Sequence, residues 1–378
     1  MNMHIKPASF HLQWHITERC NFKCKHCYIE RGVKELDTKE LFLILDQYVD
    51  LIKIWELDRN DKVRKLSIGG GEPFLRNDFF DLLERIKENR DMFTSVSIMS
   101  NGSLITKDVA DKLKEYGVSG VQISLEGTEK INDKIRGKGS FKESINGIKN
   151  LMEAGMHVGV SVTVHKENYN DFSNLLQFLK DLGVKSIGAG RLVPIGMGKN
   201  LEILQPKDLK EFYSFIMGKK KELEREGVCL STHCSDSLWF IEDQNHETHG
   251  CSAGYDSFSI LPDGDVVPCR RLPIKVGNVL EKGMFDIWYT SKILWDIRNK
   301  AKIPECGKCK FFEKCLGGAR CVAYGYFQNP FAPDPQCWKL FRSLPELREF
   351  PVKEGEMYLD GKYVEDFDPE MYFLRTGI

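Results

Sequence analysis

Two kinds of segment alternate from residue 10 to about residue 227, and this alternation constrains the fold more than any other feature. Short β-branched or apolar runs are followed by longer stretches whose apolar residues recur at helical spacing. Six such strand–helix units predict parallel strands joined by right-handed crossovers. Because eight units close a full barrel, six predict an α/β fold with an open, partial (β/α)6 barrel of the TIM type. The predicted strands are FHLQWHIT at 10–17, VRKLSIGG at 63–70, SVSIMSNG at 95–102, GVQISLEG at 120–127, HVGVSVTVH at 157–165 and VKSIGAGRLVP at 184–194.

Beyond the barrel the alternation stops, and the chain becomes rich in cysteines and turns. The segment PDGD at 262–265 lies between two strand-like runs, which predicts a hairpin. Regular apolar periodicity is weak here, so we expect bound metal to substitute for a conventional core. We therefore divide the chain into a partial barrel at 1–230, a small cysteine-rich domain at 231–345 and a tail at 346–378 that packs on the domains.

The composition excludes several classes of function. The 378 residues carry a formal net charge of −1, which gives no electrostatic reason to expect a nucleic-acid or anionic-membrane partner. No stretch approaches the roughly 18 uncharged apolar residues that a membrane-spanning helix needs. The N-terminal residues lack the apolar core and cleavage site of a secretory signal. We therefore expect a cytoplasmic protein.

The twelve cysteines are clustered along the sequence. Three lie at 20–27, two at positions 229 and 234, and seven at 251–337. Disulfides are disfavoured in a reducing cytosol, so such clusters indicate metal ligation. A lone cysteine is often a small buried hydrophobic residue, but that interpretation explains these close spacings poorly.

The first cluster, in ERCNFKCKHCYIE, has a CxxxCxxC arrangement directly after the first predicted strand. Loops at the C-terminal ends of barrel strands carry the chemistry of such folds. Three thiolates on one loop can hold three irons of a 4Fe–4S cluster and leave the fourth iron open, and an open metal site is typical of catalysis. A zinc site that adds His15 or His26 is the alternative. The three cysteines are Cys20, Cys24 and Cys27.

This spacing at this place resembles the signature of the radical S-adenosylmethionine (SAM) superfamily. The resemblance implies that the three cysteines are catalytic and that the open iron chelates the amino and carboxylate groups of SAM. Reduction of the cluster would then cleave SAM to methionine and a 5′-deoxyadenosyl radical, which abstracts hydrogen from the substrate. His26 takes the usually aromatic position before the third cysteine, and Tyr28 follows that cysteine.

The ends of the next predicted strands match positions at which the family binds SAM. SIGGGEP resembles the GGE motif, whose backbone and glutamate contact the SAM amino group, although a tight turn also explains the glycines. SNG and SLEG end the third and fourth strands, where the family places ribose and carboxylate contacts. Arg136 is either the partner of the SAM carboxylate or an ordinary surface arginine. The implied SAM-binding residues are Tyr28, Gly70, Gly71, Glu72, Pro73, Asn101, Ser124, Glu126 and Arg136.

The seven cysteines from 251 to 337 resemble the SPASM extension of radical SAM enzymes, which holds two auxiliary 4Fe–4S clusters. Five residues separate the cysteines at 315 and 321, where the usual pattern has three, so the latter is the least secure ligand. A zinc ribbon is the alternative. By the resemblance, the outer cluster would bind Cys306, Cys309, Cys315 and Cys337. The inner cluster would bind Cys251, Cys269 and Cys321, with Cys234, Cys229 or an open iron completing the set.

The resemblance covers about residues 10–340 and implies a maturase that modifies a peptide or protein side chain. A flavodoxin or ferredoxin would supply electrons. The cysteine triad begins only twenty residues in, which leaves no room for an N-terminal leader-peptide-binding domain, so a separate protein or the barrel itself would bind a leader. Radical chemistry on a small molecule, such as oxidative decarboxylation of a tetrapyrrole side chain, is the second hypothesis. A non-catalytic zinc or iron–sulfur scaffold is the third.

Cys269 is followed by Arg270 and Arg271. Anaerobic sulfatase maturases instead place an aspartate there as general base, so we do not expect sulfatase maturation. Two arginines near the inner cluster would suit a carboxylate-rich substrate, but salt bridges within the domain are the simpler explanation. Nothing in the spacing of the histidines indicates which of them acts as an acid or base.

Overall fold

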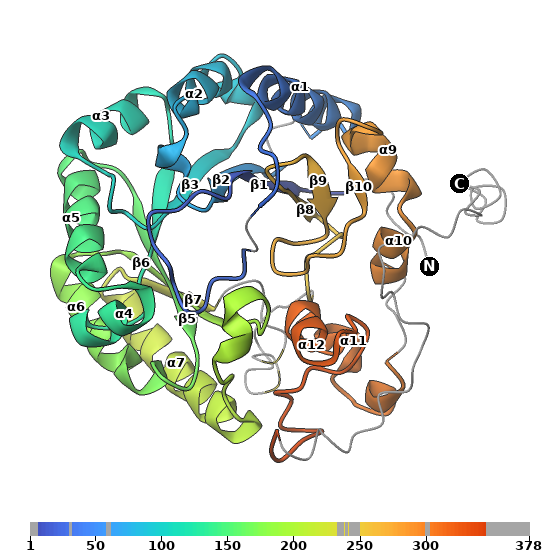
Figure 1. The fold of residues 1–378 in the computed structure, drawn as a ribbon. Helices are drawn as coiled ribbons and strands as arrows, with labels where there is room; N and C mark the ends of the chain where they lie inside the picture. The colour runs from blue at the N-terminus through green and yellow to red at the C-terminus, as the bar shows by residue number, and fades with distance from the viewer. Residues whose placement is uncertain are drawn as a thin grey trace.

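A computed structural model describes residues 7–29, 32–57, 62–232, 238, 241, 250–298 and 303–344. A curved ten-stranded sheet, in the order β10-β9-β8-β1-β2-β3-β4-β5-β6-β7, runs through the molecule, and helices cover its outer face (Figure 1). The seven parallel strands of the barrel are β1 (Phe10–Thr17), β2 (Arg64–Gly70), β3 (Ser95–Ser100), β4 (Gly120–Ser124), β5 (Val158–Val164), β6 (Ser186–Arg191) and β7 (Cys229–Thr232).

The helices that connect these strands follow the predicted alternation. The capping box of the first helix, between Asp37 and Glu40, fixes where it begins. A 3-10 turn, η1 (Pro73–Leu75), follows β2. The helices are α1 (Thr38–Ile54), α2 (Phe79–Lys87), α3 (Lys107–Glu115), α4 (Glu129–Arg136), α5 (Ser140–Glu153), α6 (Phe172–Leu182) and α7 (Pro206–Arg225).

The cysteine-rich part continues the barrel sheet. The predicted hairpin is formed by β8 (Ser257–Ile260) and β9 (Asp265–Val267), and β8 pairs in parallel with β1. The remaining elements are β10 (Gly277–Asn278), α9 (Gly283–Thr290), α10 (Lys292–Arg298), α11 (Phe312–Cys315) and α12 (Arg320–Phe327). The helices α11 and α12 lie where the ring of barrel helices is open (Figure 1).

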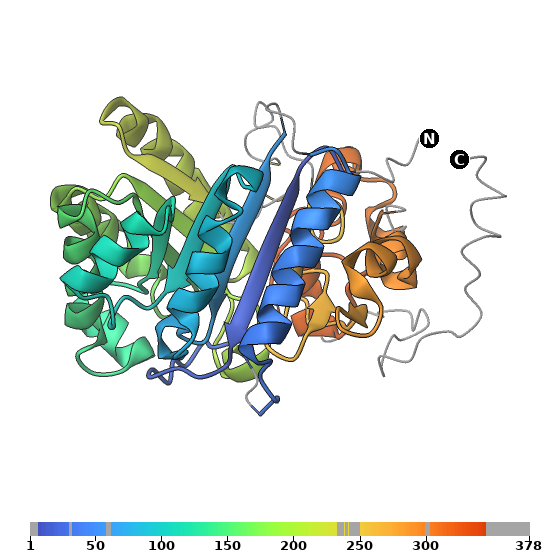
Figure 2. The same ribbon diagram turned by 90° about the horizontal axis from the view of Figure 1, so that it is seen from above.

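The α/β fold with a largely parallel sheet is confirmed, and the structure extends the six predicted strands. The short strand β7 pairs in parallel with β6 and crosses the predicted boundary at residue 230. Figure 2 shows β1 and α1 between the other barrel helices and the C-terminal helices. The predicted tail at 346–378 lies outside the described residues.

The expectation that the cysteine-rich part lacks an apolar core is wrong for residues 257–298. Phe258 of β8 and Trp288 of α9 belong to the same buried cluster as the barrel residues. The ring of Phe10 lies 5.0 Å from Trp55, 5.2 Å from Phe258 and 5.3 Å from Trp288, all edge-on. Because these aromatic pairs come from both parts of the chain, the two parts share one core.

The two faces of the barrel strands differ in polarity. On β1, the apolar side chains of Phe10, Leu12 and Trp14 are fully buried in the main core. The alternate residues His11 and Gln13 line a cavity inside the curve of the sheet. This period-2 alternation, repeated on the neighbouring strands, makes the inner face polar and positions the candidate site there.

Candidate functional site

The three cysteines of the triad come together at one cavity. Cys20, Cys24 and Cys27 lie on the loop after β1 and line a cavity of about 160 Å³. The backbone N–H of Cys27 donates to the carbonyl of Cys24 at 3.2 Å, and the N–H of Lys25 donates to the carbonyl of Ile135 at 3.0 Å. These bonds tie the loop to the end of α4. The three cysteines therefore lie at the predicted edge of the sheet, where the C-terminal ends of the strands meet.

The glycines after β2 hold the triad loop by close backbone contact. The N–H groups of Gly71 and Glu72 donate to the carbonyls of Thr17 and Arg19, each at 2.7 Å. A Cβ at Gly70 would lie 2.2 Å from the Thr17 carbonyl oxygen, and one at Gly71 would lie 2.1 Å from that of Arg19. Gly70 also has a φ of +135°, which side chains rarely allow. Both glycines line the cavity, so they shape it and position its cysteines.

Nine of the twelve predicted cluster and SAM residues form the wall of this cavity, and three do not. The wall contains Cys20, Cys24, Cys27, Tyr28, Gly70, Gly71, Asn101, Ser124 and Arg136. The three residues that the structure places behind the wall are Glu72, Pro73 and Glu126.

Glu72 faces the neighbouring strand end. Its carboxylate accepts hydrogen bonds from the Ser100 hydroxyl and the Asn101 N–H, each at 2.8 Å. Burial raises the pKa of Glu72 to about 7, although these hydrogen bonds oppose the shift. The side chain therefore joins the end of β2 to the end of β3. The contact between this carboxylate and the SAM ammonium stays a prediction.

Arg136 is buried beside the triad, so the surface interpretation of this residue is wrong. Its Nη2 forms an ion pair with Glu126 at 2.6 Å, and its Nη1 lies 3.8 Å from the sulfur of Cys24. The Nε2 atom of His26 lies 3.2 Å from the same Glu126 carboxylate. Burial alone would raise the pKa of Glu126, but His26 and Arg136 outweigh it and lower that pKa to about 2. Glu126 therefore remains ionised and holds Arg136 toward the triad.

The donor set of the triad fits an iron–sulfur cluster. Each cysteine of such a cluster binds a different iron, so the sulfurs surround a volume. A tetrahedral zinc ion requires its ligand atoms about 2.0–2.3 Å from one point. Among the described residues, no group of three or more His, Cys, Asp or Glu side chains converges on a single ion in this way.

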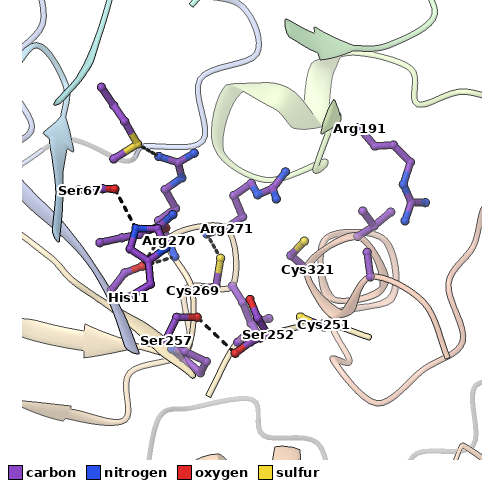
Figure 3. A pocket seen from close by; sticks show the side chains of 18 of the residues that line it. His11, Ser67, Arg191, Cys251, Ser252, Ser257, Cys269, Arg270, Arg271 and Cys321 are labelled. Carbon is purple, nitrogen blue, oxygen red and sulfur yellow. Dashed lines mark hydrogen bonds between the residues drawn. The ribbon is translucent and has the colours of Figure 1, made fainter. Parts of the chain in front are cut away.

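The predicted inner set also comes together. Cys251, Cys269 and Cys321 line a second cavity of about 310 Å³, and Figure 3 shows their sulfur atoms at one side of it. The long spacing before Cys321 is accommodated because Gly317 and Gly318 adopt φ values of +84° and +90°. Cys321 thus lines the same cavity as the other two cysteines.

The fourth position of the inner set is not filled by a described residue. Cys234 lies outside the described residues. Cys229 is exposed at the start of β7 and lines neither of the two cavities. The start of a parallel strand lies at the edge opposite its C-terminal end, so this alternative ligand lies at the wrong edge of the sheet.

The four cysteines predicted for the outer cluster surround a small cavity of about 20 Å³: Cys306, Cys309, Cys315 and Cys337. The N–H of Cys309 donates to the carbonyl of Cys306 at 2.9 Å. Burial raises the pKa of the Cys306 thiol to about 12, so metal binding there must displace a proton. Four thiols around one closed space are typical of a structural or electron-transferring site, without an open position.

Sequence reasoning assigned no role to several polar residues of the cavity walls. His11 lies 2.8 Å from the hydroxyl of Ser67, which lies 2.7 Å from that of Ser97, so a polar chain crosses three strands. Burial, with Lys65 and Arg270 nearby, lowers the pKa of His11 to about 4, and its imidazole is neutral at pH 7. The period-2 alternation of β1 is the signal that could have indicated an inward-facing histidine.

Arg191 at the end of β6 connects the barrel to the cysteine-rich part. Its Nη1 and Nη2 atoms pair with the two carboxylate oxygens of Asp334 at 3.0 and 2.7 Å, and Nη1 also donates to Gln336 at 2.8 Å. Such a buried bidentate pair neutralises the arginine. Asp334 lies far away in sequence, so no local pattern predicts this contact.

The two cavities adjoin each other and share part of their walls, so the triad and the inner cysteines lie in neighbouring parts of the structure. Five residues belong to the walls of both cavities: Met99, Gln122, Arg191, Arg270 and Arg271. A group bound at the triad would therefore lie next to one bound beside the inner cysteines. Among the described residues, no helix is both long enough and apolar enough to span a membrane.

Comparison with known proteins gives matches in both parts of the chain. Residues 14–179 match the radical SAM superfamily, and residues 251–310 match SPASM, an iron–sulfur cluster-binding domain. The chain is 28% identical over 358 residues to Fe-coproporphyrin III synthase of Methanosarcina barkeri, with 86% of each chain covered. It is 30% identical over 345 residues to mycofactocin maturase MftC of Mycolicibacterium smegmatis, with 86% of this chain and 82% of that protein covered.

Solved structures show the same architecture. The crystal structure of Streptococcus suis SuiB bound to S-adenosylmethionine superposes with a TM-score of 0.68 at 22% identity, covering 88% of this chain and 77% of SuiB. SuiB has also been crystallised with its precursor peptide SuiA, and that structure matches equally well, with a TM-score of 0.68. At 22% identity, this similarity shows a shared fold.

Proposed function

This chain belongs to the radical SAM superfamily and carries a SPASM domain, and we propose that it modifies a side chain of a peptide or protein. The observation that carries the proposal is that the triad cavity and the cavity of the inner cysteines share part of their walls. Such a site accepts SAM at one end and a substrate side chain at the other. Relatives named as maturases and a fold shared with a precursor-peptide-bound enzyme support a peptide substrate.

The cofactors are SAM, a 4Fe–4S cluster of the radical SAM domain and auxiliary clusters of the SPASM domain. When bound, the reduced radical SAM cluster cleaves SAM and so supplies the 5′-deoxyadenosyl radical that abstracts hydrogen from substrate. Cys20, Cys24 and Cys27 hold that cluster. Cys251, Cys269 and Cys321, with Cys234 as fourth ligand, hold the inner auxiliary cluster. The outer auxiliary cluster takes Cys306, Cys309, Cys315 and Cys337.

The surrounding residues orient SAM and exclude water. Arg136 presents its guanidinium to the SAM carboxylate, and Glu126 positions Arg136. Tyr28, Asn101 and Ser124, together with Gly70 and Gly71, form the rest of the wall around SAM. Glu72 acts indirectly, because it fixes the ends of β2 and β3.

The remaining parts of the proposal concern domains and partners. We place the radical SAM barrel at 1–230 and the SPASM domain at 231–345, with the C-terminal tail at 346–378. A flavodoxin or ferredoxin supplies the electrons. A separate protein or the barrel itself binds the leader of a precursor peptide.

One observation favours a second candidate function, the oxidative decarboxylation of a tetrapyrrole side chain. Arg270 and Arg271 line both cavities, where cationic side chains suit propionate groups. The relative named Fe-coproporphyrin III synthase supports this candidate. The two candidates differ in substrate and share the same radical chemistry.

SAM cleavage tests the enzyme assignment. The protein is reconstituted anaerobically with iron and sulfide, reduced with dithionite and mixed with SAM, and 5′-deoxyadenosine and methionine are measured. We expect turnover in the wild type, loss of turnover in Cys24→Ala and unchanged turnover in Cys229→Ala, because Cys229 lines neither cavity. Zinc in place of iron, with no cleavage, would contradict the radical SAM function.

Product analysis separates the two substrates. The reconstituted enzyme is incubated either with peptides encoded beside its gene or with coproporphyrin III, and mass spectrometry follows both. A mass change in a peptide supports maturation. A loss of carbon dioxide from the porphyrin, with unchanged peptides, supports the second candidate.

A further inference from the structure

Arg270 occupies the junction of the two cavities. It follows Cys269 directly, and its backbone N–H donates to the hydroxyl of Ser259 on β8 at 2.9 Å. Its guanidinium lies 5.9 Å from the ring centre of Tyr28, which belongs to the triad side of the site. Figure 3 shows Arg270 beside His11, above the cysteines of the inner set. The head group therefore lies between the SAM side and the auxiliary side.

Among the described residues, the charged side chains that line the cavities around Arg270 are mainly cationic. The charged residues that line the larger cavity are Arg191, Arg270 and Arg271, and no described carboxylate lines it. Asp334 neutralises Arg191. In the smaller cavity the carboxylate is that of Glu18, which accepts hydrogen bonds from the N–H groups at positions 32 and 33.

Arg270 itself forms no ion pair with any carboxylate in the described part of the chain. Its side chain contacts the thioether sulfur of Met99, a weak acceptor, and lies over the ring of Tyr28. The nearby His11 and His15 have pKa values lowered to about 4 and about 3 by burial and by Arg270, so both are neutral and neither supplies an anion. A partly buried guanidinium is costly unless an anion pairs with it. The Arg270 guanidinium therefore needs an anionic partner that the described residues do not supply.

We infer that Arg270 binds a carboxylate of the substrate and holds it between SAM and the inner auxiliary site. This inference rests on the proposed radical SAM function and adds the chemical class of the substrate group. A guanidinium binds a carboxylate through two parallel hydrogen bonds, which fixes orientation as well as position. The carboxylate belongs either to a tetrapyrrole propionate or to an acidic peptide residue, and both present the same chemistry.

Two other anions compete for this role, and each has a distinct signature. A cluster at the inner cysteines would be the partner if removal of the arginine lowered iron content. The SAM carboxylate would be the partner if removal weakened SAM binding. Arg136 already lies beside the triad with its Nη1 3.8 Å from Cys24, so the SAM side has a cation of its own.

Probe binding to the reconstituted holoenzyme tests the inference. The first arm measures the fluorescence anisotropy of coproporphyrin III against that of its tetramethyl ester. The second arm uses dansyl-Gly-Glu-Gly-amide against the Gln counterpart. We expect the wild type to prefer one carboxylated probe to its neutral counterpart, and the preferred arm identifies the source of the carboxylate. In Arg270→Gln that probe should bind about tenfold more weakly, with no change for the neutral one.

Two further variants complete the test. Arg270→Lys should retain part of the preference, because it keeps the charge but not the paired hydrogen bonds. Lys275→Gln removes a positive charge from the same domain, where Lys275 pairs with Asp265 away from both cavities, and should bind as the wild type does. Iron content, SAM affinity and SAM cleavage are measured on every preparation.

The possible outcomes are distinct. The inference is overturned if the wild type binds neither carboxylated probe more tightly than its neutral counterpart, or if Arg270→Gln binds as the wild type does. It is equally overturned if Arg270→Gln loses iron or SAM affinity in place of probe affinity. Wild-type SAM cleavage reports separately on the proposed function, so failure of the carboxylate site leaves the radical SAM assignment intact.

Discussion

At the scale of single residues, two buried glutamates behind the triad cavity have opposite electrostatic character. Glu126 is paired with Arg136 and His26, and its pKa is lowered to about 2. Glu72 accepts hydrogen bonds from neutral groups, and burial raises its pKa to about 7. Direct pairing with Arg136 and His26 thus distinguishes Glu126, whose pKa is lowered, from Glu72, whose pKa is raised. The clusters of cysteines were evident from their spacing and their division into sets came from the family resemblance, whereas the partners of these glutamates depend on tertiary contacts.

Glu72 should make stability depend on pH. Because its folded-state pKa is raised, its ionisation destabilises the fold as pH rises from about 4.3, the unfolded value, through about 7. We expect wild-type apoprotein to lose stability relative to Glu72→Gln between pH 5 and pH 8. Urea unfolding of both proteins at each pH measures this difference in stability. The contributions of other titrating groups cancel, because the two proteins have them in common. Parallel stability curves would contradict the assigned pKa.

Removal of the Glu126 charge should destabilise the fold at pH 7. Glu126→Gln leaves the buried Arg136 without its ionised partner, and breaking such a pair costs about 3–5 kcal/mol. The free energy of unfolding of the apoprotein is the measurement. Glu129→Gln is the control, because it breaks an exposed pair with Lys142 and should cost below about 1 kcal/mol. Equal losses in the free energy of unfolding of the two variants would contradict a larger contribution from the buried pair.

At the scale of secondary-structure elements, the strands contribute to the site through residues at their C-terminal ends and on their inner faces. The six barrel strands were predictable because β-branched runs and helical spacing are local signals. The strand β7 was not, because four residues carry little periodicity, and the pairing of β8 with β1 joins segments some 246 positions apart. The inward direction of His11 follows from alternation, but its contact with Ser67 depends on the register of two strands.

The glycines after β2 provide a test at this scale. A Cβ at Gly71 would lie 2.1 Å from the Arg19 carbonyl oxygen, so Gly71→Ala should displace the triad loop. We expect a clear loss of reconstituted iron and of the absorbance of the radical SAM cluster. Gly218→Ala is the matched control, because a Cβ there meets nothing within 4 Å and alanine favours helix α7 by about 1 kcal/mol. Full iron content in Gly71→Ala would contradict this account.

At the scale of the whole molecule, the barrel and the cysteine-rich part form one cooperative body. They share a sheet through β1 and β8 and an aromatic cluster through Phe10 and Trp288. Arg191 and Asp334 add a buried ion pair between them. The composition of the sequence indicated two separate regions. The shared core was not predictable, because it is built from contacts between residues far apart in the sequence.

Trp288 tests this coupling. The side chain is fully buried against residues of both regions, so Trp288→Ala should destabilise the protein by about 3–5 kcal/mol. Urea unfolding, followed by circular dichroism, should show a single transition in the wild type and an earlier one in the variant. Phe285→Ala on the same helix removes a side chain that is 42% exposed and should have a small effect. Two separate transitions in the wild type would contradict a shared core.

The pairing of β8 with β1 has a consequence for any shortened form of this protein. Without the cysteine-rich part, residues 11–14 of β1 would keep their neighbours on β2 but lose those on β8, and β1 would become an open sheet edge. Such an edge, flanked by the apolar surface of Phe10 and Trp55, is a template for association with other chains. The barrel expressed alone should therefore aggregate. The cysteine-rich part thus also protects the edge of the sheet from association with other chains.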